Sequence, residues 1–186
     1  MIYIIIGSFS FILFFLYDFN SVTWKNPVIH RFFLMGSVIL LTATLIMLVQ
    51  FRESLWKGIV NNPIWLVFSI GFSTLLIYTL FFALPFDDTY GHLSDNRKTY
   101  TKGVYSLCRH PGVLWFVGMY FSFYLLTKEP LILVISIIWS FWNILYVVFQ
   151  DLWIFPKTFV DYHNYQSTTP FLIPSLSKLR RFKDQT

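Results

Sequence analysis

VLWFVGMYFSFYLLTKEPLILVISIIWSFWNILYVVF, residues 113–149, decides the fold of this chain. Two apolar runs, Val113–Leu126 and Leu131–Phe149, are separated here by only four residues that end in Pro130. Proline is well tolerated in the first turn of a helix, so the second run is expected to begin a new helix directly after the turn. The second run is long enough to cross a bilayer, and the first is shorter. The stretch therefore predicts a tight antiparallel helical hairpin in a membrane.

Three more apolar runs precede this hairpin, at Ile2–Tyr17, Phe32–Gln50 and Ile64–Leu84. Hydrophobic residues make up 56% of the 186 residues and charged residues only 12%, which is more apolar surface than a soluble domain of this size can bury. We therefore predict a single all-α, polytopic membrane domain over residues 1–186, with about five transmembrane helices. Its predicted parts are three N-terminal spans (1–85), a cytosolic loop (86–111), the hairpin (112–149), a covering C-terminal segment (150–174) and a basic tail (175–186).

Basic residues are divided unequally between the two sides that five spans would create. Eleven of the fourteen Lys and Arg residues fall on the side of the C-terminus, and only Arg52, Lys57 and Lys128 fall on the other, beside a loop flanked by Trp56 and Trp65. Because the side rich in Lys and Arg faces the cytoplasm, we expect an integral membrane protein with its N-terminus outside and its C-terminus in the cytoplasm. The net charge of +5 is explained by this topology, so we predict no nucleic-acid partner.

Several classes of site and segment are excluded by the absence of their motifs. Cys108 is the single cysteine, so no internal disulfide can form. The four histidines have no metal-ligand spacing, and we predict no metal. Neither GxGxxG nor a Walker A motif occurs, which excludes a soluble Rossmann-type methyltransferase or dehydrogenase. The first apolar run has no basic stretch before it and no small-residue cleavage site after it, so we expect a membrane helix there and not a cleaved signal.

Ionisable and amide side chains gather at both ends of the hairpin. Arg109, His110 and Pro111 precede it, and Gln150 and Asp151 follow it, so an antiparallel hairpin brings them to the same membrane face. Pro111 disfavours a helical His110, and the free N–H groups of the helix that follows can bind a carboxylate together with Arg109. Asp151 opposes its helix dipole and needs a cation, either Arg109 or a cationic ligand. The alternative is an interfacial anchor, in which Arg109 reaches lipid headgroups and His110-Pro111 only turns the chain.

Two further stretches carry polar or aromatic side chains toward the same face. Tyr162 and Tyr165 lie three residues apart, on one side of a short predicted helix that Pro170 and Pro174 end. Such a cytosolic interfacial helix either covers a pocket or lies on the membrane without a ligand. A stripe along the second hairpin helix either leads to a pocket or joins helices by hydrogen bonds, and it contains Trp139, Asn143, Tyr146 and Gln150.

Taken in order, these pieces resemble the isoprenylcysteine carboxyl methyltransferase and phospholipid methyltransferase family of membrane enzymes. That family shows Gly-x-Tyr, Arg-His-Pro-x-Tyr-x-Gly, a helical hairpin, Glu-Glu, Phe-Gly-x-x-Tyr-x-x-Tyr and Pro-x-x-x-Pro. The residues that match this pattern are Gly103, Tyr105, Arg109, His110, Pro111, Tyr162, Tyr165, Pro170 and Pro174, with Asp151 in place of the second Glu. The positions that depart from the pattern are Val113, Trp115, Gln150 and Phe159.

The resemblance implies S-adenosylmethionine-dependent methyl transfer at the cytosolic membrane face. Its acceptor would be lipophilic: an isoprenylcysteine-like carboxylate, a phospholipid amine or another small lipophile. The resemblance also implies catalytic roles for Arg109, His110 and Asp151. The cofactor-binding set that it implies is Gly103, Tyr105, Arg109, His110, Pro111, Gln150, Asp151, Tyr162 and Tyr165. Two alternatives are a non-catalytic member that binds a lipid or a partner helix, and an NADPH-dependent membrane reductase. The sequence assigns neither the acceptor nor the oligomeric state.

Overall fold

The fold is built from five long apolar helices. A computed structural model describes residues 2–83 and 97–174, and in this part of the chain there is no β-strand. The long helices are α1 (Ile2–Val22), α2 (Phe32–Gln50), α4 (Ile64–Phe81), α6 (Pro111–Thr127) and α7 (Pro130–Phe149). Four segments are long and apolar enough to cross a membrane, and α6, with 17 residues, is shorter. The predicted all-α polytopic membrane fold is therefore confirmed. The predicted tail and residues 86–96 of the predicted cytosolic loop lie outside the described residues.

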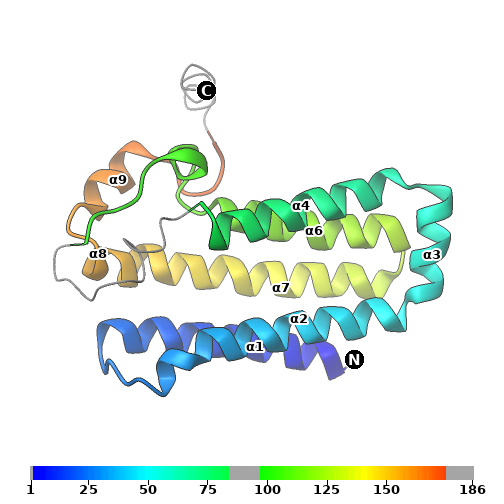
Figure 1. The fold of residues 1–186 in the computed structure, drawn as a ribbon, viewed down its shortest axis with the longest axis horizontal. Helices are drawn as coiled ribbons and strands as arrows, with labels where there is room; N and C mark the ends of the chain where they lie inside the picture. The colour runs from blue at the N-terminus through cyan, green and yellow to red at the C-terminus, as the bar shows by residue number, and fades with distance from the viewer. Residues whose placement is uncertain (1, 84–96, 175–186) are drawn as a thin grey trace.

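The helices form two pairs with one helix between them. α1 packs against α2, and α4 packs against α6, while α7 contacts both α1 and α6 (Figure 1). The α6–α7 turn contains Lys128 in a left-handed conformation, with a φ of 58°, and Pro130 begins α7. The tight hairpin predicted from residues 113–149 is therefore present.

Close helix approach and buried hydrogen bonds hold the bundle together at α7. Trp139 is fully buried, and a Cβ atom added to Gly7 of α1 would lie 2.1 Å from its ring, so α1 and α7 meet where no larger residue fits. The Ser136 hydroxyl donates to the carbonyl oxygen of Tyr120 in α6 at 2.9 Å. Small residues and buried hydroxyls of this kind are the usual means by which membrane helices associate.

The outer surface of the bundle is apolar, as a lipid-facing surface must be. α4 shows this most clearly, because the two residues it buries are Ser69 and Thr79. Val67, Ile70 and Ile77 of the same helix are exposed. A soluble helix would bury the aliphatic side chains and expose the hydroxyls. The inverted pattern places the hydrocarbon of the bilayer around α4.

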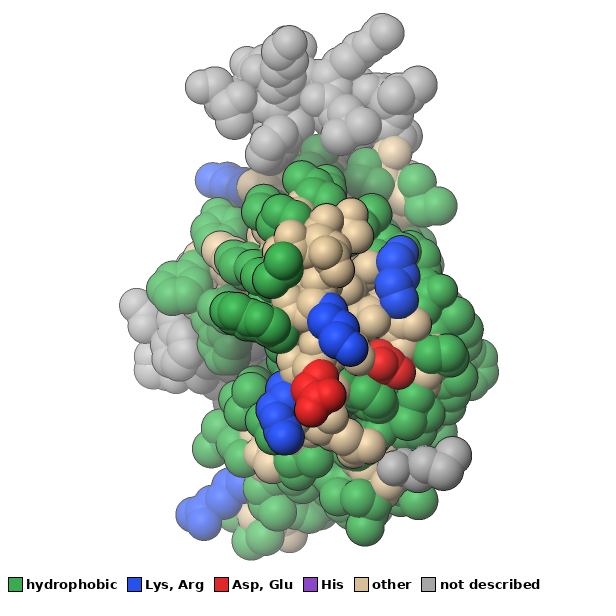
Figure 2. Space-filling model, turned by 90° about the vertical axis from the view of Figure 1, so that its right-hand side faces the viewer, with side chains coloured by type: hydrophobic (Ala, Val, Ile, Leu, Met, Phe, Trp, Pro, Cys, Tyr) green, Lys and Arg blue, Asp and Glu red, His purple; other side chains and the backbone are tan. Residues whose placement is uncertain are grey.

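A short helix that the sequence analysis did not predict lies across one end of the bundle. Residues 51–63 were expected to form a loop, yet α3 (Arg52–Asn61) joins α2 to α4 and packs against α6. Gly58 allows this contact, because an added Cβ atom would lie 2.0 Å from the carbonyl oxygen of Leu126. Figure 2 shows this end, where basic and acidic side chains gather inside a hydrophobic rim.

Shorter elements build the opposite end of the molecule. The helix α7 continues through a single π-helical turn, η3 (Gln150–Ile154), into α8 (Phe155–Thr158). The 3-10 turn η2 (Gly103–Ser106) and the helix α9 (Tyr162–Thr168) lie beside them (Figure 1). The α1–α2 connection, with Lys25, Arg31 and the 3-10 turn η1 (Ile29–Arg31), lies at this same end. Among the described residues, the bundle therefore separates Arg52, Lys57 and Lys128 from the basic residues at the opposite end.

Candidate functional site

A buried ion pair links the two ends of the α6–α7 hairpin. The Arg109 Nη2 atom donates to Asp151 Oδ2 at 3.0 Å, and Arg109 Nε lies 2.9 Å from Asp151 Oδ1. Asp151 is only 4% exposed. The Nε–H is not aligned with an acceptor, so the pair is held by charge at that atom and by one aligned hydrogen bond. Arg109 is therefore the cation that the sequence analysis required beside Asp151.

Three more side chains complete the surroundings of Asp151. The Tyr162 hydroxyl donates to Oδ1 at 2.5 Å, and His110 Nε2 lies 3.2 Å from the same oxygen. Gln166 Nε2 donates to Oδ2 at 3.2 Å and to the Asp151 carbonyl oxygen at 2.9 Å. We call Arg109, His110, Asp151, Tyr162 and Gln166 the Asp151 cluster. A buried carboxylate is tolerated when it is both paired and hydrogen-bonded, and this cluster provides both.

The C-terminal segment fixes the backbone of the Arg-His-Pro turn. The Arg109 N–H donates to the carbonyl oxygen of Pro170 at 2.9 Å, and the His110 N–H donates to that of Phe171 at 3.2 Å. His110 has non-helical backbone angles (φ −126°, ψ 62°), and Pro111 is the first residue of α6, as the sequence predicts. Arg109 Nη1 also donates to the carbonyl oxygen of Gln166 at 2.9 Å. The predicted covering segment therefore lies directly on the turn.

His110 is packed among aromatic rings and is neutral at physiological pH. Its ring stacks on Phe155, with centroids 5.8 Å apart, and meets Phe171 edge-on at 5.1 Å. Burial lowers the pKa of His110, and the Arg109 charge acts in the same direction, while the hydrogen bond and charge of Asp151 oppose this shift. A neutral ring facing a carboxylate donates from Nε2 and keeps a lone pair on Nδ1. The Asp151 cluster then has no net charge.

Two tyrosines from α9 connect the Asp151 cluster to the η2 turn. The buried Tyr165 hydroxyl donates to the carbonyl oxygen of Tyr105 at 2.6 Å, and the Tyr105 hydroxyl donates to that of Thr79 in α4 at 3.1 Å. Burial raises the pKa of Tyr162, and its hydrogen bond to Asp151 raises it further. Burial also raises the pKa of Tyr165. Both hydroxyls therefore remain protonated donors.

The structure brings together some of the predicted site residues and separates others. Gly103 is exposed at the start of η2, where its φ of +57° suits glycine, and it does not contact Asp151. Gln150 points away from Arg109: its Nε2 donates to Asp18 Oδ2 in α1 at 2.8 Å. The sequence analysis missed Asp18 and Gln166, because each is a single polar residue without a motif around it. Asp18, directly after the first apolar run, was the one that hydropathy could have indicated.

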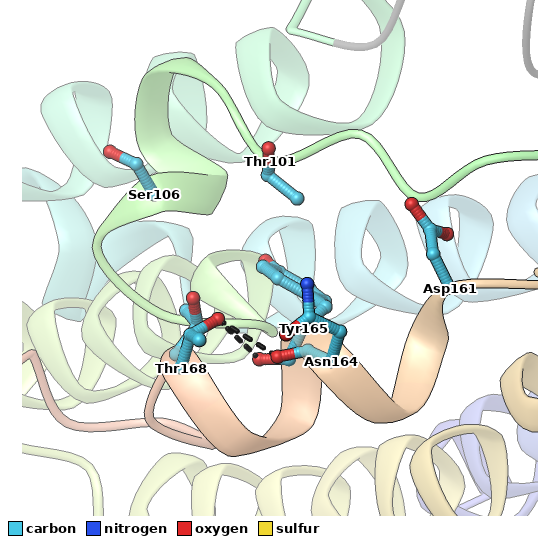
Figure 3. Close-up of a pocket in the computed structure, with 7 residues that line it drawn as sticks. Thr101, Ser106, Asp161, Asn164, Tyr165 and Thr168 are labelled. Carbon is cyan, nitrogen blue, oxygen red and sulfur yellow. Dashed lines mark hydrogen bonds between the residues drawn. The ribbon is translucent and has the colours of Figure 1, made fainter.

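An open polar cavity lies on the other side of α9 (Figure 3). Its volume is about 260 Å³, and it is lined by Thr101, Ser106, Asp161, Asn164, Tyr165, Thr168 and Thr169. Of the predicted site residues only Tyr165 lines it. Burial alone would raise the pKa of Asp161, but hydrogen bonds from the Thr99 N–H and hydroxyl lower it. Asp161 therefore stays ionised and ties residue 99 to the start of α9.

Comparison with known families gives one match. The family model described as "Phospholipid methyltransferase" matches residues 63–159, from the start of α4 to just beyond α8. The matched residues include Arg109, His110 and Asp151, and they leave out α1 and α9. No match is found among curated proteins or among solved structures.

Proposed function

Because this chain belongs to the phospholipid methyltransferase family, we propose that it transfers a methyl group from S-adenosylmethionine to a lipophilic acceptor. The observation that carries the proposal is the buried pair of Arg109 and Asp151, set at the end of two apolar helices. Burying two charges is costly, and an apolar pair of the same volume would stabilise the bundle at least as well. A ligand with both a cationic and an anionic group gives this pair a use.

The side chains of the Asp151 cluster fit the amino-acid end of the proposed cofactor. Arg109 would hold its carboxylate, because a guanidinium group matches the geometry of a carboxylate. Asp151 would hold its ammonium group, and the rings of Tyr105, Tyr162 or Tyr165 suit the positively charged sulfonium. When bound, S-adenosylmethionine supplies an electrophilic methyl group.

The protein's own contribution would be to bind, to orient and to exclude water. Methyl transfer needs no protein nucleophile, so alignment of the two reactants would supply most of the acceleration. His110 or Asp151 would be the base for an acceptor that must lose a proton. The acceptor would approach from the bilayer, because the helices that carry the site are surrounded by exposed apolar side chains. The distribution of basic residues supports a cytosolic location for this end of the bundle.

Calorimetry of the detergent-purified protein tests the proposal. We expect S-adenosylmethionine and S-adenosylhomocysteine to bind and NADPH to give no signal. We also expect Arg109→Ala and Asp151→Ala each to weaken cofactor binding more than tenfold, because each removes one half of the charge pair. Arg52→Ala and Glu53→Ala, which change exposed charges at the opposite end, are matched controls and should bind like the wild type.

The alternatives give different results in the same titrations. NADPH binding without S-adenosylmethionine binding would indicate a reductase. The absence of binding for all three ligands would indicate a non-catalytic member that binds a lipid or a partner helix. Unchanged affinity in both Arg109→Ala and Asp151→Ala would move the cofactor away from the Asp151 cluster.

A further inference from the structure

A second buried carboxylate, that of Asp18, contacts Gln150, the residue that precedes Asp151. Asp18 of α1 is only 6% exposed. Its Oδ2 accepts a hydrogen bond from Gln150 Nε2 at 2.8 Å, and the same Gln150 nitrogen lies 2.9 Å from the Tyr146 hydroxyl. Among residues 2–83 and 97–174 no Lys, Arg or His forms an ion pair with Asp18. Burial without a cation is costly, so this carboxylate is expected to have a purpose.

Aromatic rings enclose the contact between Asp18 and Gln150 on both sides. One turn before Asp18, Phe15 packs on Phe149 with centroids 5.2 Å apart. One residue after Asp18, Phe19 stacks on Trp153 with centroids 5.1 Å apart and an angle of 10°. The Asp18 end of the hydrogen bond is therefore shielded from water, which strengthens the bond and makes its loss more costly.

This shielded contact holds the residue next to Asp151. Gln150 is the first residue of the π-turn η3, and Asp151 is the second. Gln150 points to α1, while Asp151 points to Arg109 and His110. A π-turn departs from the regular helical hydrogen-bond pattern, and such turns occur frequently at functional sites. A side-chain anchor on one of its residues determines where the next residue points.

We propose that Asp18 is a positioning residue for Asp151. It acts through Gln150: the Asp18–Gln150 bond ties η3 to α1 and so sets the direction in which the Asp151 carboxylate approaches Arg109. The first helix, which lies outside the residues matched by the family model, then contributes to the site. This proposal rests on the proposed function only in the experiments that measure cofactor affinity.

Substitutions at both partners, combined with Asp151→Ala, test the proposal. Asp18→Leu removes the acceptor, whereas Asp18→Asn keeps an oxygen that can accept from Gln150. Gln150→Leu removes the hydrogen bond from Gln150 to Asp18 and leaves the one from Tyr146, and it replaces Asp18→Leu if that variant does not fold. Ser10→Ala is the matched control, because Ser10 is a fully buried polar residue of the same helix whose hydroxyl bonds only to Ile6 of its own helix. Each variant is titrated with S-adenosylmethionine and melted in detergent, with and without Asp151→Ala.

We expect Asp18→Leu and Gln150→Leu to weaken S-adenosylmethionine binding fivefold or more, and Asp18→Asn and Ser10→Ala to stay within twofold of the wild type. In the Asp151→Ala background the effect of Asp18→Leu should disappear, because no carboxylate is left to position. A purely structural role predicts instead that the two effects multiply. Multiplying effects, or wild-type affinity in Asp18→Leu, would overturn the proposal.

Failure of the proposed function would be visible separately. If the wild-type protein does not bind S-adenosylmethionine, the proposed function fails. The melting temperatures of the wild type, Asp18→Leu, Asp151→Ala and the double variant then decide about Asp18. A smaller loss from Asp18→Leu in the Asp151→Ala background than in the wild type supports the coupling through η3. Equal losses in the two backgrounds contradict it.

Discussion

The arrangement around Asp151 shows how a charged residue persists at the end of an apolar helix. Each of its carboxylate oxygens has a hydrogen-bond donor, and Arg109 balances its charge. Removing one partner from such a cluster costs more than the partner contributes, because the remaining groups stay buried and lose a bond. Single substitutions in the cluster therefore report on the whole of it.

Tyr162→Phe tests the shortest bond of the cluster. The substitution removes the hydroxyl that donates to Asp151 Oδ1 at 2.5 Å and keeps the ring. We expect it to destabilise the protein by about 1–3 kcal/mol, as for a lost bond to a buried charged group. Denaturant unfolding in detergent measures this, with Tyr124→Phe as the control, since the Tyr124 hydroxyl has no hydrogen-bond partner among the described residues. Equal stabilities of the two variants would contradict the arrangement around Asp151.

His110 gives the stability a defined pH dependence. Burial lowers the pKa of His110 in the folded protein, so the unfolded chain binds a proton first as the pH falls below about 6.5. Stability should therefore be highest above about pH 6.5 and should decline toward the lower folded-state pKa of His110. His110→Gln should reduce this decline, as thermal melts between about pH 5 and 8 will measure. A His110→Gln protein that loses as much stability as the wild type on acidification would contradict a neutral, buried His110.

At the residue scale, the sequence was sufficient to identify charged residues that stand next to long apolar runs. Arg109, His110 and Asp151 stand out because they interrupt apolar runs at the two ends of one hairpin. Gln166 could not be found this way, because its role arises only when α9 folds back onto η3. Gln150 was placed in the site by its position next to Asp151, but its side chain turns to a helix 132 residues earlier in the chain. Side-chain direction at a π-turn depends on tertiary contacts that a sequence pattern does not contain.

At the scale of elements, the sequence predicted the five long helices and the short helix with Tyr162 and Tyr165, which is α9, but it did not predict α3. Each of the five apolar runs became a helix. The limits of α2 are those of the run Phe32–Gln50, and the other four differ by a few residues, as with Ile2–Tyr17, which extends to Val22 as α1. α3 was not predicted because its ten residues include charged and polar side chains and do not form a long apolar run. Packing of α3 against α6 stabilises this helix, and Gly58 lies against the Leu126 carbonyl oxygen at the contact. The π-turn has no signature in the sequence either.

Gly58→Ala tests the docking of α3. A Cβ atom at this position would lie 2.0 Å from backbone that cannot move easily, so α3 must shift away from α6. We expect a clear loss of thermal stability, despite the higher helix propensity of alanine. Gly71→Ala is the matched control, because no atom lies within 4 Å of its added Cβ. Gly71→Ala should melt like the wild type or slightly higher. Equal melting temperatures for the two variants would contradict the close approach.

At the scale of the whole molecule, the bundle has two chemically different ends. One carries α3 and the α6–α7 turn, and the other carries the α1–α2 connection, η2 and α9 (Figure 1). The apolar helices between them are as long as the hydrocarbon core of a bilayer is thick, about 30 Å for a 20-residue helix. Hydropathy was sufficient to predict apolar helices between two polar ends. The direction of insertion depends on the distribution of Lys and Arg and is still a prediction.

Cysteine labelling tests the direction of insertion. Lys57→Cys places an exposed thiol on α3, and Lys102→Cys places one next to η2 at the other end. In intact cells a membrane-impermeant maleimide should label Cys at position 57 and should reach position 102 only after permeabilisation. The background is low, because Cys108 is 1% exposed and burial raises its pKa to about 11. The reverse labelling pattern would invert the proposed orientation.

The backbone bonds from Arg109 and His110 to the carbonyl oxygens of residues 170 and 171 have a consequence for biosynthesis. Membrane helices enter the bilayer in the order in which the ribosome makes them, but this turn is completed only after residues 170 and 171 have been translated. Until then Arg109 can contact only some of the groups that it binds in the folded protein. A nascent chain that stalls or is cut before residue 170 would leave a half-paired charge beside lipid. Such a chain would be a natural substrate for the proteases that clear misassembled membrane proteins.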